Sequence, residues 1–239
     1  MFSMRVVFND ELAELVYVFQ DRFDAGLRLA EWLKSLNVSA EITYAIPAGG
    51  VPVGFVVAKT LNTSLDVLVC RKLLIPWNRE AGFGAVSPSG SYFYDELFAL
   101  NLGLTHSDIK QSIEEQLVEI KRRLRVYRCN QEYSTLSGES VIVVDDGIAA
   151  GYTMIAATRF LREIDAGRII VAVPTCHTES AYRVAREVSE VYCLNPRSGP
   201  VYAVADAYIE WRDLEDADVL EVLREAKNTG LLAYRADCI

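Results

Sequence analysis

The sequence lacks several features that mark whole classes of protein. It has no CxxC pair, only two histidines, no internal repeat, no apolar run long enough to cross a bilayer and no hydrophobic signal segment in its first ten residues. The cysteines are five, an odd number: Cys70, Cys129, Cys176, Cys193 and Cys238. We therefore expect reduced, buried thiols in a cytoplasmic protein, rather than a disulfide framework, a zinc site or a membrane partner.

Basic residues are also in deficit, with 24 Lys and Arg against 33 Asp and Glu, a formal net charge of −9. Such a chain should not bind nucleic acid over a broad surface. If its ligand is a polyanion, the positive potential must be local, from helix N-termini, backbone N–H groups, a metal ion and a few basic side chains. What is abundant is apolar: 51% of the 239 residues are hydrophobic, enough for a large buried core.

Apolar strand-like runs alternate with amphipathic helical patterns along the chain. Strands are expected at 43–46, 65–71, 141–144, 169–173 and 191–194, and helices at 22–36, 54–60, 153–162, 180–188 and 214–226. This alternation predicts an α/β fold with a doubly wound, mainly parallel sheet. We expect one domain across residues 1–239.

Residues 73–104 differ, because glycine and proline punctuate them. Phe83–Val86 and Tyr92–Tyr94 flank a Ser-Pro-Ser-Gly turn and predict a hairpin. Thr105 and Asp108 predict a capping box for a long helix. One face of that helix is charged, and we interpret it as solvated rather than as a binding patch; its residues are Glu114, Glu115, Glu119, Lys121, Arg122 and Arg123.

The strongest candidate site is the segment from Val141 to Thr153. Two carboxylates, Asp145 and Asp146, follow a buried strand, and a loop of small residues then leads into a helix. Backbone N–H groups at a helix N-terminus can surround a phosphate, and the carboxylates suit a ribose diol or a magnesium ion. The pattern therefore predicts a ribose-5-phosphate site; the alternative is an ordinary strand end with a helix cap.

The order of these residues resembles the signature by which type I phosphoribosyltransferases bind phosphoribosyl pyrophosphate (PRPP). The resemblance covers about residues 19–224 and is greatest to the group known as predicted phosphoribosyltransferases. It also includes the stretches 46–53, 65–73, 84–86, 171–174 and 202–204.

The resemblance implies roles for particular residues. Asp145 and Asp146 would be the catalytic residues and would hold the ribose hydroxyls. The 5-phosphate would be bound by Ala149, Ala150, Gly151, Tyr152 and Thr153. Pyrophosphate would be bound by Ala48, Gly49, Gly50, Arg71 and Lys72, with the glycines supplying unusual backbone angles.

Three positions depart from the family pattern. Ala48 stands where a basic residue is usual, Ala150 where threonine is usual, and Tyr152 where a small residue is usual. Each departure removes or changes a contact to PRPP, and Ala48 and Ala150 suit a protein that binds PRPP or nucleotides without catalysis.

Two further segments are implied by the resemblance. Residues 76–102 correspond to a flexible hairpin lid that closes over the substrates, and residues 195–213 to a hood over the acceptor. Aromatic rings in the hood can stack on a heterocycle or pack the hood itself. We expect at least one of four residues to line the acceptor pocket: Tyr202, Asp206, Tyr208 and Trp211.

The expected activity is transfer of ribose 5-phosphate from magnesium-PRPP to a nitrogenous acceptor with release of pyrophosphate. The cofactor is Mg²⁺, the partners are small-molecule substrates, and a homo-oligomer is expected. A regulatory protein that binds PRPP or a nucleotide without catalysis is the main alternative, and a hydrolase that acts on a phosphoribosyl compound is a further one. No Ser-His-Asp arrangement and no general base can be identified in the sequence.

Overall fold

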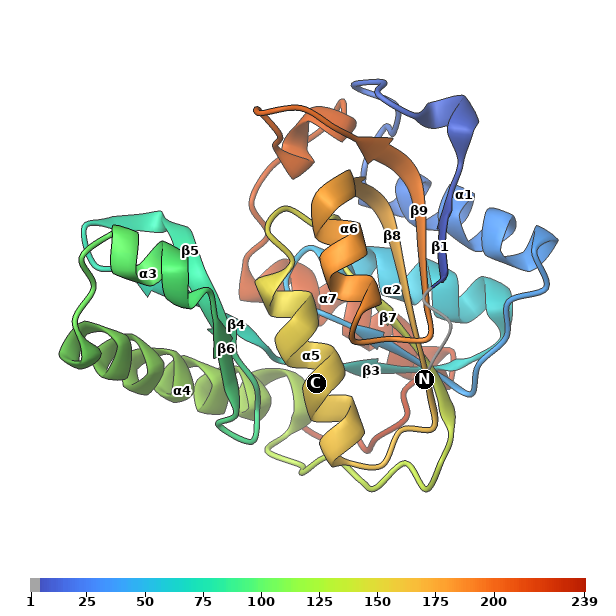
Figure 1. The fold of residues 1–239 in the computed structure, drawn as a ribbon. Coiled ribbons are helices and arrows are strands. Elements are labelled where there is room, and N and C mark those ends of the chain that lie inside the picture. The colour runs from blue at the N-terminus through green and yellow to red at the C-terminus, as the bar shows by residue number, and fades with distance from the viewer. Residues whose placement is uncertain (1–4) are drawn as a thin grey trace.

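The computed structural model describes residues 5–239, apart from the side chains of Arg79 and Glu80. At its centre lies a six-stranded sheet in the order β1-β9-β8-β7-β2-β3, in which every neighbouring pair is parallel (Figure 1). The strands are β1 (Arg5–Phe8), β2 (Ile42–Ala45), β3 (Ser64–Val67), β7 (Ser140–Val144), β8 (Arg168–His177) and β9 (Glu190–Arg197). Strands β7 and β8 are apolar on both faces, as parallel strands covered by helices must be.

Helices cover both faces of this sheet. Alternate residues of β7 and β8, such as Val143 and Val171, pack with α5 (Tyr152–Glu163) and α6 (Thr178–Ala185). The intervening residues, such as Ile142 and Ile170, pack with α1 (Arg22–Ser35) and α2 (Gly50–Leu61). The predicted doubly wound parallel fold is therefore confirmed. The remaining short elements are η1 (Asp10–Leu12) and η2 (Val204–Ala207).

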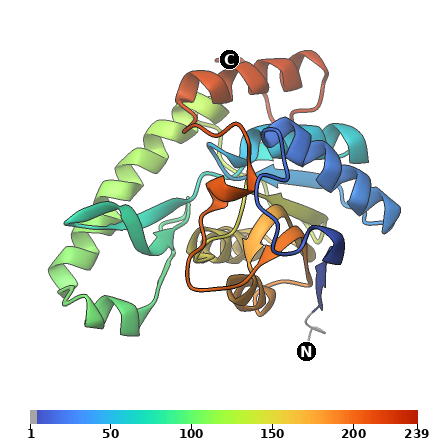
Figure 2. The same cartoon turned by 90° about the horizontal axis from the view of Figure 1, so that it is seen from above.

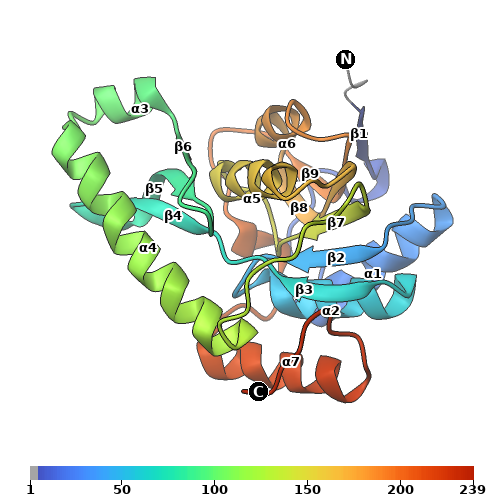
Figure 3. The ribbon, with the colours of Figure 1, turned by 90° about the horizontal axis from the view of Figure 1, so that it is seen from below.

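A second sheet extends to one side of the first (Figures 2 and 3). It is antiparallel, with strands β4 (Arg71–Ile75), β5 (Asn78–Val86) and β6 (Tyr92–Tyr94), and it continues into α3 (Glu96–Asn101) and α4 (His106–Arg128). The predicted hairpin and the Thr105 capping box are both present. Helix α4 reaches the closing helix α7 (Asp216–Asn228), and the two pack in one apolar cluster.

The prediction of one buried strand from Leu65 to Arg71 is wrong. Strand β3 ends at Val67, and Arg71 begins β4 in the other sheet. Between them the N–H of Cys70 donates to the carbonyl of Leu68 (3.1 Å). The N–H of Val69 donates to the hydroxyl of Tyr133 (3.1 Å) instead of a neighbouring strand. The sequence does not reveal this turn, because the apolar residues of the run are buried both in a continuous strand and in a strand that ends in a turn.

The cysteine prediction is wrong for two of the five residues. Cys129 and Cys238 form a disulfide, whereas Cys70, Cys176 and Cys193 are buried free thiols. The two partners are 109 residues apart, and the tail brings them together: Leu232 pairs with Leu65, and the hydroxyl of Tyr234 donates to the carbonyl of Tyr127 (2.7 Å). Within residues 5–239, no helix is both long and apolar enough to span a membrane.

The packing of the hairpin shows which part of the predicted lid, residues 76–102, is held against the rest of the protein. Phe83, Ala85 and Val86 are fully buried, and the hydroxyl of Ser89 donates to Glu163 of α5 (2.6 Å). By contrast, Trp77 in the β4–β5 turn is 63% exposed. The middle of the hairpin, at 83–89, is thus packed against the body of the protein. The tip of the β4–β5 hairpin at 76–82, which consists of the turn at 76–77 and the first residues of β5, is the part that we propose as the lid.

Limited proteolysis should therefore cut the native protein first within residues 76–82, because exposed turns open locally at little free-energy cost. Mass spectrometry of the fragments identifies the site. Magnesium-PRPP should slow this cut if the turn closes over the ligand. First cleavage within 83–102, or a rate at 76–82 that ligand leaves unchanged, would count against this lid.

Candidate functional site

A cavity of about 710 Å³ lies beyond the carboxyl ends of β2 and β7, where ligands bind in open parallel sheets. Segments remote in sequence line it together: 48–49, 71–72, 81–82, 145–154 and 211–214 with gaps, along with Arg22, Arg123 and Val204. The predicted acid pair, phosphate loop and pyrophosphate-loop residues Ala48 and Gly49 therefore meet at one cavity.

Asp145 and Asp146 sit in different surroundings although they are adjacent. Burial, and then the charge of Asp146, raise the pKa of Asp145 well above its usual value, and Lys72 opposes the shift only in part. Asp146 instead accepts a hydrogen bond at Oδ2 from Nε of Arg22 (2.8 Å), in an ion pair whose side chains are 8% and 15% exposed. Asp145 thus lacks a matched cation among the described residues, whereas Asp146 has one.

Arg22 is a residue that the sequence analysis missed. It begins α1, its Nη1 donates to the carbonyl of Arg212 (3.0 Å), and its guanidinium lies 3.9 Å from the ring centre of Trp211. A signal for it was available, because a cation in the first turn of a helix opposes the helix dipole and needs a compensating partner. Arg22 joins the hood to the acid pair.

Gly49 and Gly50 are required because a side chain at either position would clash with the acid pair. The prediction that they supply unusual backbone angles is wrong. Gly49 has ordinary helical angles (φ −61°, ψ −32°) as the N-cap of α2. A Cβ atom on Gly49 would fall 1.8 Å from Oδ2 of Asp146, and one on Gly50 would fall 2.9 Å from Cα of Asp145. The peptide bond between Pro47 and Ala48 is cis. The glycines let this loop lie directly against the acid pair, and α2 accordingly starts at Gly50 rather than at Gly54.

The loop at 149–153 has the form expected of a phosphate site. Gly151 adopts φ +83° as the N-cap of α5, no side chain caps that helix, and its first turn holds no acidic residue. Ala149 and Ala150 are exposed. The ring of Tyr152 packs 6.0 Å from that of Phe93, and its hydroxyl donates to Asp95 (3.4 Å). The large side chain at this position therefore contacts the hairpin, while the backbone N–H groups stay at the cavity.

Arg71 and Lys72 line the cavity from the start of β4. Nε of Arg71 donates to Oε1 of Gln116 on α4 (3.2 Å), and burial lowers the pKa of Arg71, with the charge of Arg123 adding to the effect. Arg123 lines the same cavity. The charged face of α4 is therefore not wholly solvated, which corrects our interpretation of that face.

The four predicted acceptor residues separate in the structure. Trp211 lines the cavity, as do Val204, Asp213 and Leu214, which the sequence analysis did not select. Tyr208 is 1% exposed, and its hydroxyl donates to the carbonyl of Asp146 (2.6 Å). Tyr208 thus holds the backbone of Asp146 and is not among the residues that line the cavity.

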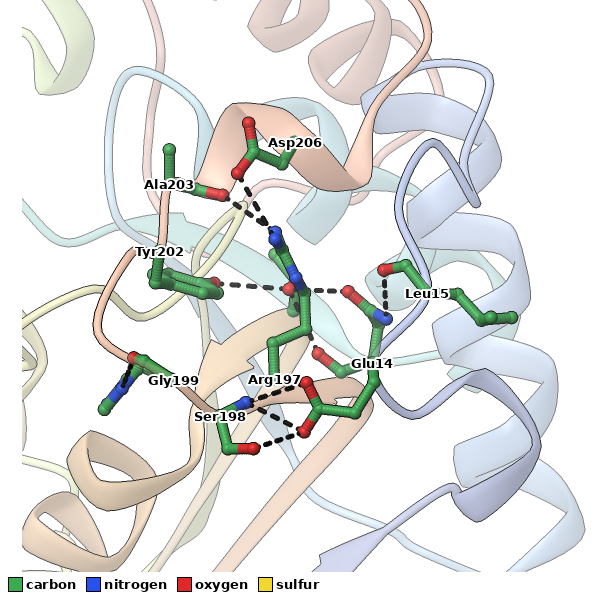
Figure 4. Close-up of polar contacts among 11 residues, drawn as sticks. Glu14, Leu15, Arg197, Ser198, Gly199, Tyr202, Ala203 and Asp206 are labelled. Atoms are coloured by element: carbon green, nitrogen blue, oxygen red, sulfur yellow. Dashed lines mark hydrogen bonds and ion pairs between the residues drawn. The ribbon is translucent and has the colours of Figure 1, made fainter.

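The other two residues hold the hood together (Figure 4). The hydroxyl of Tyr202 donates to Oγ1 of Thr175 (3.2 Å), and Asp206 pairs with Arg197 (3.3 Å). Glu14 ties the same loop to the N-terminal segment through Ser198, as Figure 4 shows. Neither Tyr202 nor Asp206 is among the residues that line the cavity.

Replacing Asp145 by asparagine should stabilise the ligand-free protein at neutral pH by about 0.5–2 kcal/mol. The pKa of Asp145 is raised in the folded state, so folding favours the protonated form, and stability falls as pH rises from the unfolded-state value toward the folded-state value. The gain should vanish by about pH 3, about one unit below the unfolded-state pKa, where the carboxyl is protonated in both states. Urea unfolding at pH 7.5 and at acidic pH measures both.

The exposed Asp237 is the control for this change, because its replacement by asparagine relieves no buried charge. A variant Asp145→Asn that is no more stable than the parent at pH 7.5 would contradict the electrostatic account of this site.

Comparison with known proteins identifies relatives of this chain. Residues 90–205 match the family model described as phosphoribosyl transferase domain. The chain is 35% identical over 224 residues to the Mycobacterium tuberculosis (strain ATCC 25618 / H37Rv) protein named "Putative phosphoribosyl transferase Rv0571c", and the protein of strain CDC 1551 / Oshkosh gives the same figures. The match covers 92% of this chain and 50% of the relative, so the chain spans about half the length of the curated relatives it matches.

One solved structure is similar to this chain over nearly the whole length of the solved protein. The protein TT1426 from Thermus thermophilus is 33% identical, with a TM-score of 0.68, and the match covers 87% of this chain and 98% of that one. The chain belongs to the type I phosphoribosyltransferase family.

Proposed function

We propose that this member of the type I phosphoribosyltransferase family transfers ribose 5-phosphate from magnesium-PRPP to a nitrogenous acceptor and releases pyrophosphate. One observation carries the proposal: a single cavity is lined by an acid pair, an uncapped helix N-terminus behind a small-residue loop, residues of a glycine loop and several cations. These groups match, in turn, the diol, the 5-phosphate and the pyrophosphate of PRPP.

The loop at 149–153 would bind the 5-phosphate. Gly151 in its left-handed conformation turns the chain so that the first N–H groups of α5 are available to the anion. Thr153 adds a hydroxyl, and Ala149 and Ala150 leave room for phosphate oxygens because they carry only methyl groups. No cationic side chain belongs to this loop, so its own attraction for the anion comes from the backbone. Arg183 of α6 lies beside the loop, and its Nη1 donates to the carbonyl of Ala150 (3.2 Å).

Asp145 and Asp146 would accept hydrogen bonds from the ribose hydroxyls. A diol is neutral, so it can lie against carboxylates that would repel a phosphate. Arg22 holds Asp146 in place through Oδ2, and Tyr208 holds the backbone of the same residue. Asp145, whose charge is penalised by burial, gains most from a hydroxyl or a cation.

The donor set fits a magnesium ion brought in by the substrate rather than one held by the protein alone. Among the described residues, no cluster of three His, Cys, Asp or Glu side chains could hold a metal. Mg²⁺ commonly binds one or two carboxylates together with substrate phosphates, which suits Asp145 with PRPP. When bound, the ion supplies charge neutralisation for the leaving pyrophosphate.

The reaction breaks the bond from C1 of the ribose to a pyrophosphate oxygen and forms a bond from C1 to the acceptor nitrogen. The residues named here position the two reactants and stabilise charge, and none forms a covalent bond. The tip of the β4–β5 hairpin at 76–82 and the hood would exclude water from the reacting carbon. Trp211 is the residue we propose for stacking on a planar acceptor, because it is the member of the four that lines the cavity. The guanidinium of Arg22 lies against its ring (3.9 Å) and would help to orient it.

Release of pyrophosphate on mixing with magnesium-PRPP and a panel of purine and pyrimidine bases tests the proposal. A coupled pyrophosphate assay should show base-dependent turnover, with the matching nucleotide detected by mass spectrometry. Tight binding of PRPP without turnover on any base would support the regulatory alternative. Pyrophosphate release that needs no base would indicate hydrolysis.

A further inference from the structure

Besides Arg22, three cationic side chains line the main cavity: Arg71 and Lys72 on β4, and Arg123 on α4. Arg22 is already paired, with Asp146 at Nε and with the carbonyl of Arg212 at Nη1. In the part of the chain that the structure describes, the terminal nitrogens of the other three make no hydrogen bond, since Arg71 and Arg123 are held only at Nε. Their donors are therefore available to a ligand.

Helix α4 presents Arg123 through a neighbouring carboxylate. Oε1 of Glu119 accepts from Nε of Arg123 (2.8 Å) and from Nη2 of Arg122 (2.8 Å), so one carboxylate serves two guanidinium groups. Arg122 also pairs with Asp216, so Glu119 and Asp216 together balance Arg122 and Arg123. Among the described residues no carboxylate pairs with Arg71, which is hydrogen-bonded to Gln116 and whose pKa is lowered by burial and by Arg123. Arg71 and Arg123 are like-charged neighbours that repel each other, and an anion bound to both would offset that repulsion.

The glycine loop makes this cluster more significant. Its residues Ala48, Gly49 and Gly50 offer only a methyl group and backbone atoms, so they bring no cation to the cavity. A diphosphate group carries several charges and needs more than one charge-assisted hydrogen bond. The available cations come instead from β4 and from α4, a helix that the sequence pattern assigned to solvent.

We propose that Arg123 is an anion-binding residue that acts with Arg71 and Lys72, and that the three together bind a diphosphate group. Glu119 is the positioning residue that holds Arg123 toward the cavity. The inference rests on the proposed function, because it assigns this cluster to the pyrophosphate end of the substrate. It makes the placement of α4 a condition for binding the leaving group.

Calorimetric titration with two probes, inorganic pyrophosphate with Mg²⁺ and ribose 5-phosphate, tests this assignment. Arg123→Gln should weaken pyrophosphate binding at least tenfold and leave ribose 5-phosphate binding within about twofold. Arg123→Lys should lie between, because lysine keeps the charge but loses the planar fork. The matched control is Arg125→Gln, on the same helix but exposed and not among the cavity residues, which should change neither.

Three outcomes would overturn the inference. These are pyrophosphate binding by Arg123→Gln equal to the parent, an equal loss of both probes, and no pyrophosphate binding by the parent. Failure of the proposed function looks different: the parent would bind pyrophosphate in an Arg123-dependent manner yet transfer ribose 5-phosphate to no base. Base-dependent transfer together with Arg123-independent pyrophosphate binding would sink the inference alone.

Discussion

The double variant Asp145→Asn, Asp146→Asn should lose most of the melting shift that magnesium-PRPP gives to the parent protein. A ligand at a hundredfold excess over its dissociation constant stabilises the native state by about 2.7 kcal/mol. For a domain of this size that is a shift of roughly 5 to 10 °C. Differential scanning fluorimetry with and without ligand measures it.

The loss follows from two contacts removed together. The carboxylate charges that would meet the magnesium ion disappear, and the amides are weaker acceptors for the ribose hydroxyls. Relief of the buried charge at Asp145 offsets only part of the cost of breaking the ion pair between Asp146 and Arg22, so the ligand shift is measured relative to the variant's own ligand-free melting temperature. A parent-like shift in the double variant would show that these two residues do not hold the ligand.

The choice of control depends on the tertiary structure. Asp66 is a natural choice from its place in the sequence, but it is 4% exposed and its two carboxylate oxygens accept from Arg128 (2.8 and 3.0 Å). Breaking a buried pair by removing one partner costs about 3–5 kcal/mol, so Asp66→Asn would confuse folding with binding. Asp237→Asn, on an exposed residue, should keep the full shift.

Gly151→Val should also abolish the shift, for a different reason. Gly151 has φ +83°, a conformation that a β-branched residue adopts only with strain, and a Cβ atom there would lie 3.2 Å from the side chain of Val184. The loop must then move, which displaces the N–H groups that would bind the 5-phosphate. The same fluorimetric titration reports the loss, and ribose 5-phosphate should fail to protect this variant as well.

Gly103→Val is the matched control for backbone strain. Gly103 also has positive φ (+71°), no atom of the described chain lies within 4 Å of a Cβ added there, and the residue is not among those that line the cavity. It should lose a similar amount of stability through the same backbone conformation, yet still respond to magnesium-PRPP. Equal ligand shifts in the two variants would rule out a phosphate loop at 149–153.

The main features of the fold and half of the site were predictable from local patterns. The alternation of apolar strands and amphipathic helices predicts the parallel sheet, because strands buried on both faces are apolar along their length. Val141 to Thr153 predicts its own site, since the strand, the two acids, the small residues and the helix start are contiguous. Contiguous sites leave a signature that one stretch of sequence contains in full.

What only the tertiary structure decided depends on residues that are distant in the chain. The pairing of Arg22 with Asp146, the entry of Arg123 into the cavity and the bond between Cys129 and Cys238 each join segments separated by roughly a hundred residues or by a change of sheet. Local periodicity records which face of an element is apolar, but it does not record which polar residue of another element meets it. The two glycines at 49 and 50 show the same limit, because the sequence marks them as special, while the space they leave for the acid pair exists only in the folded chain.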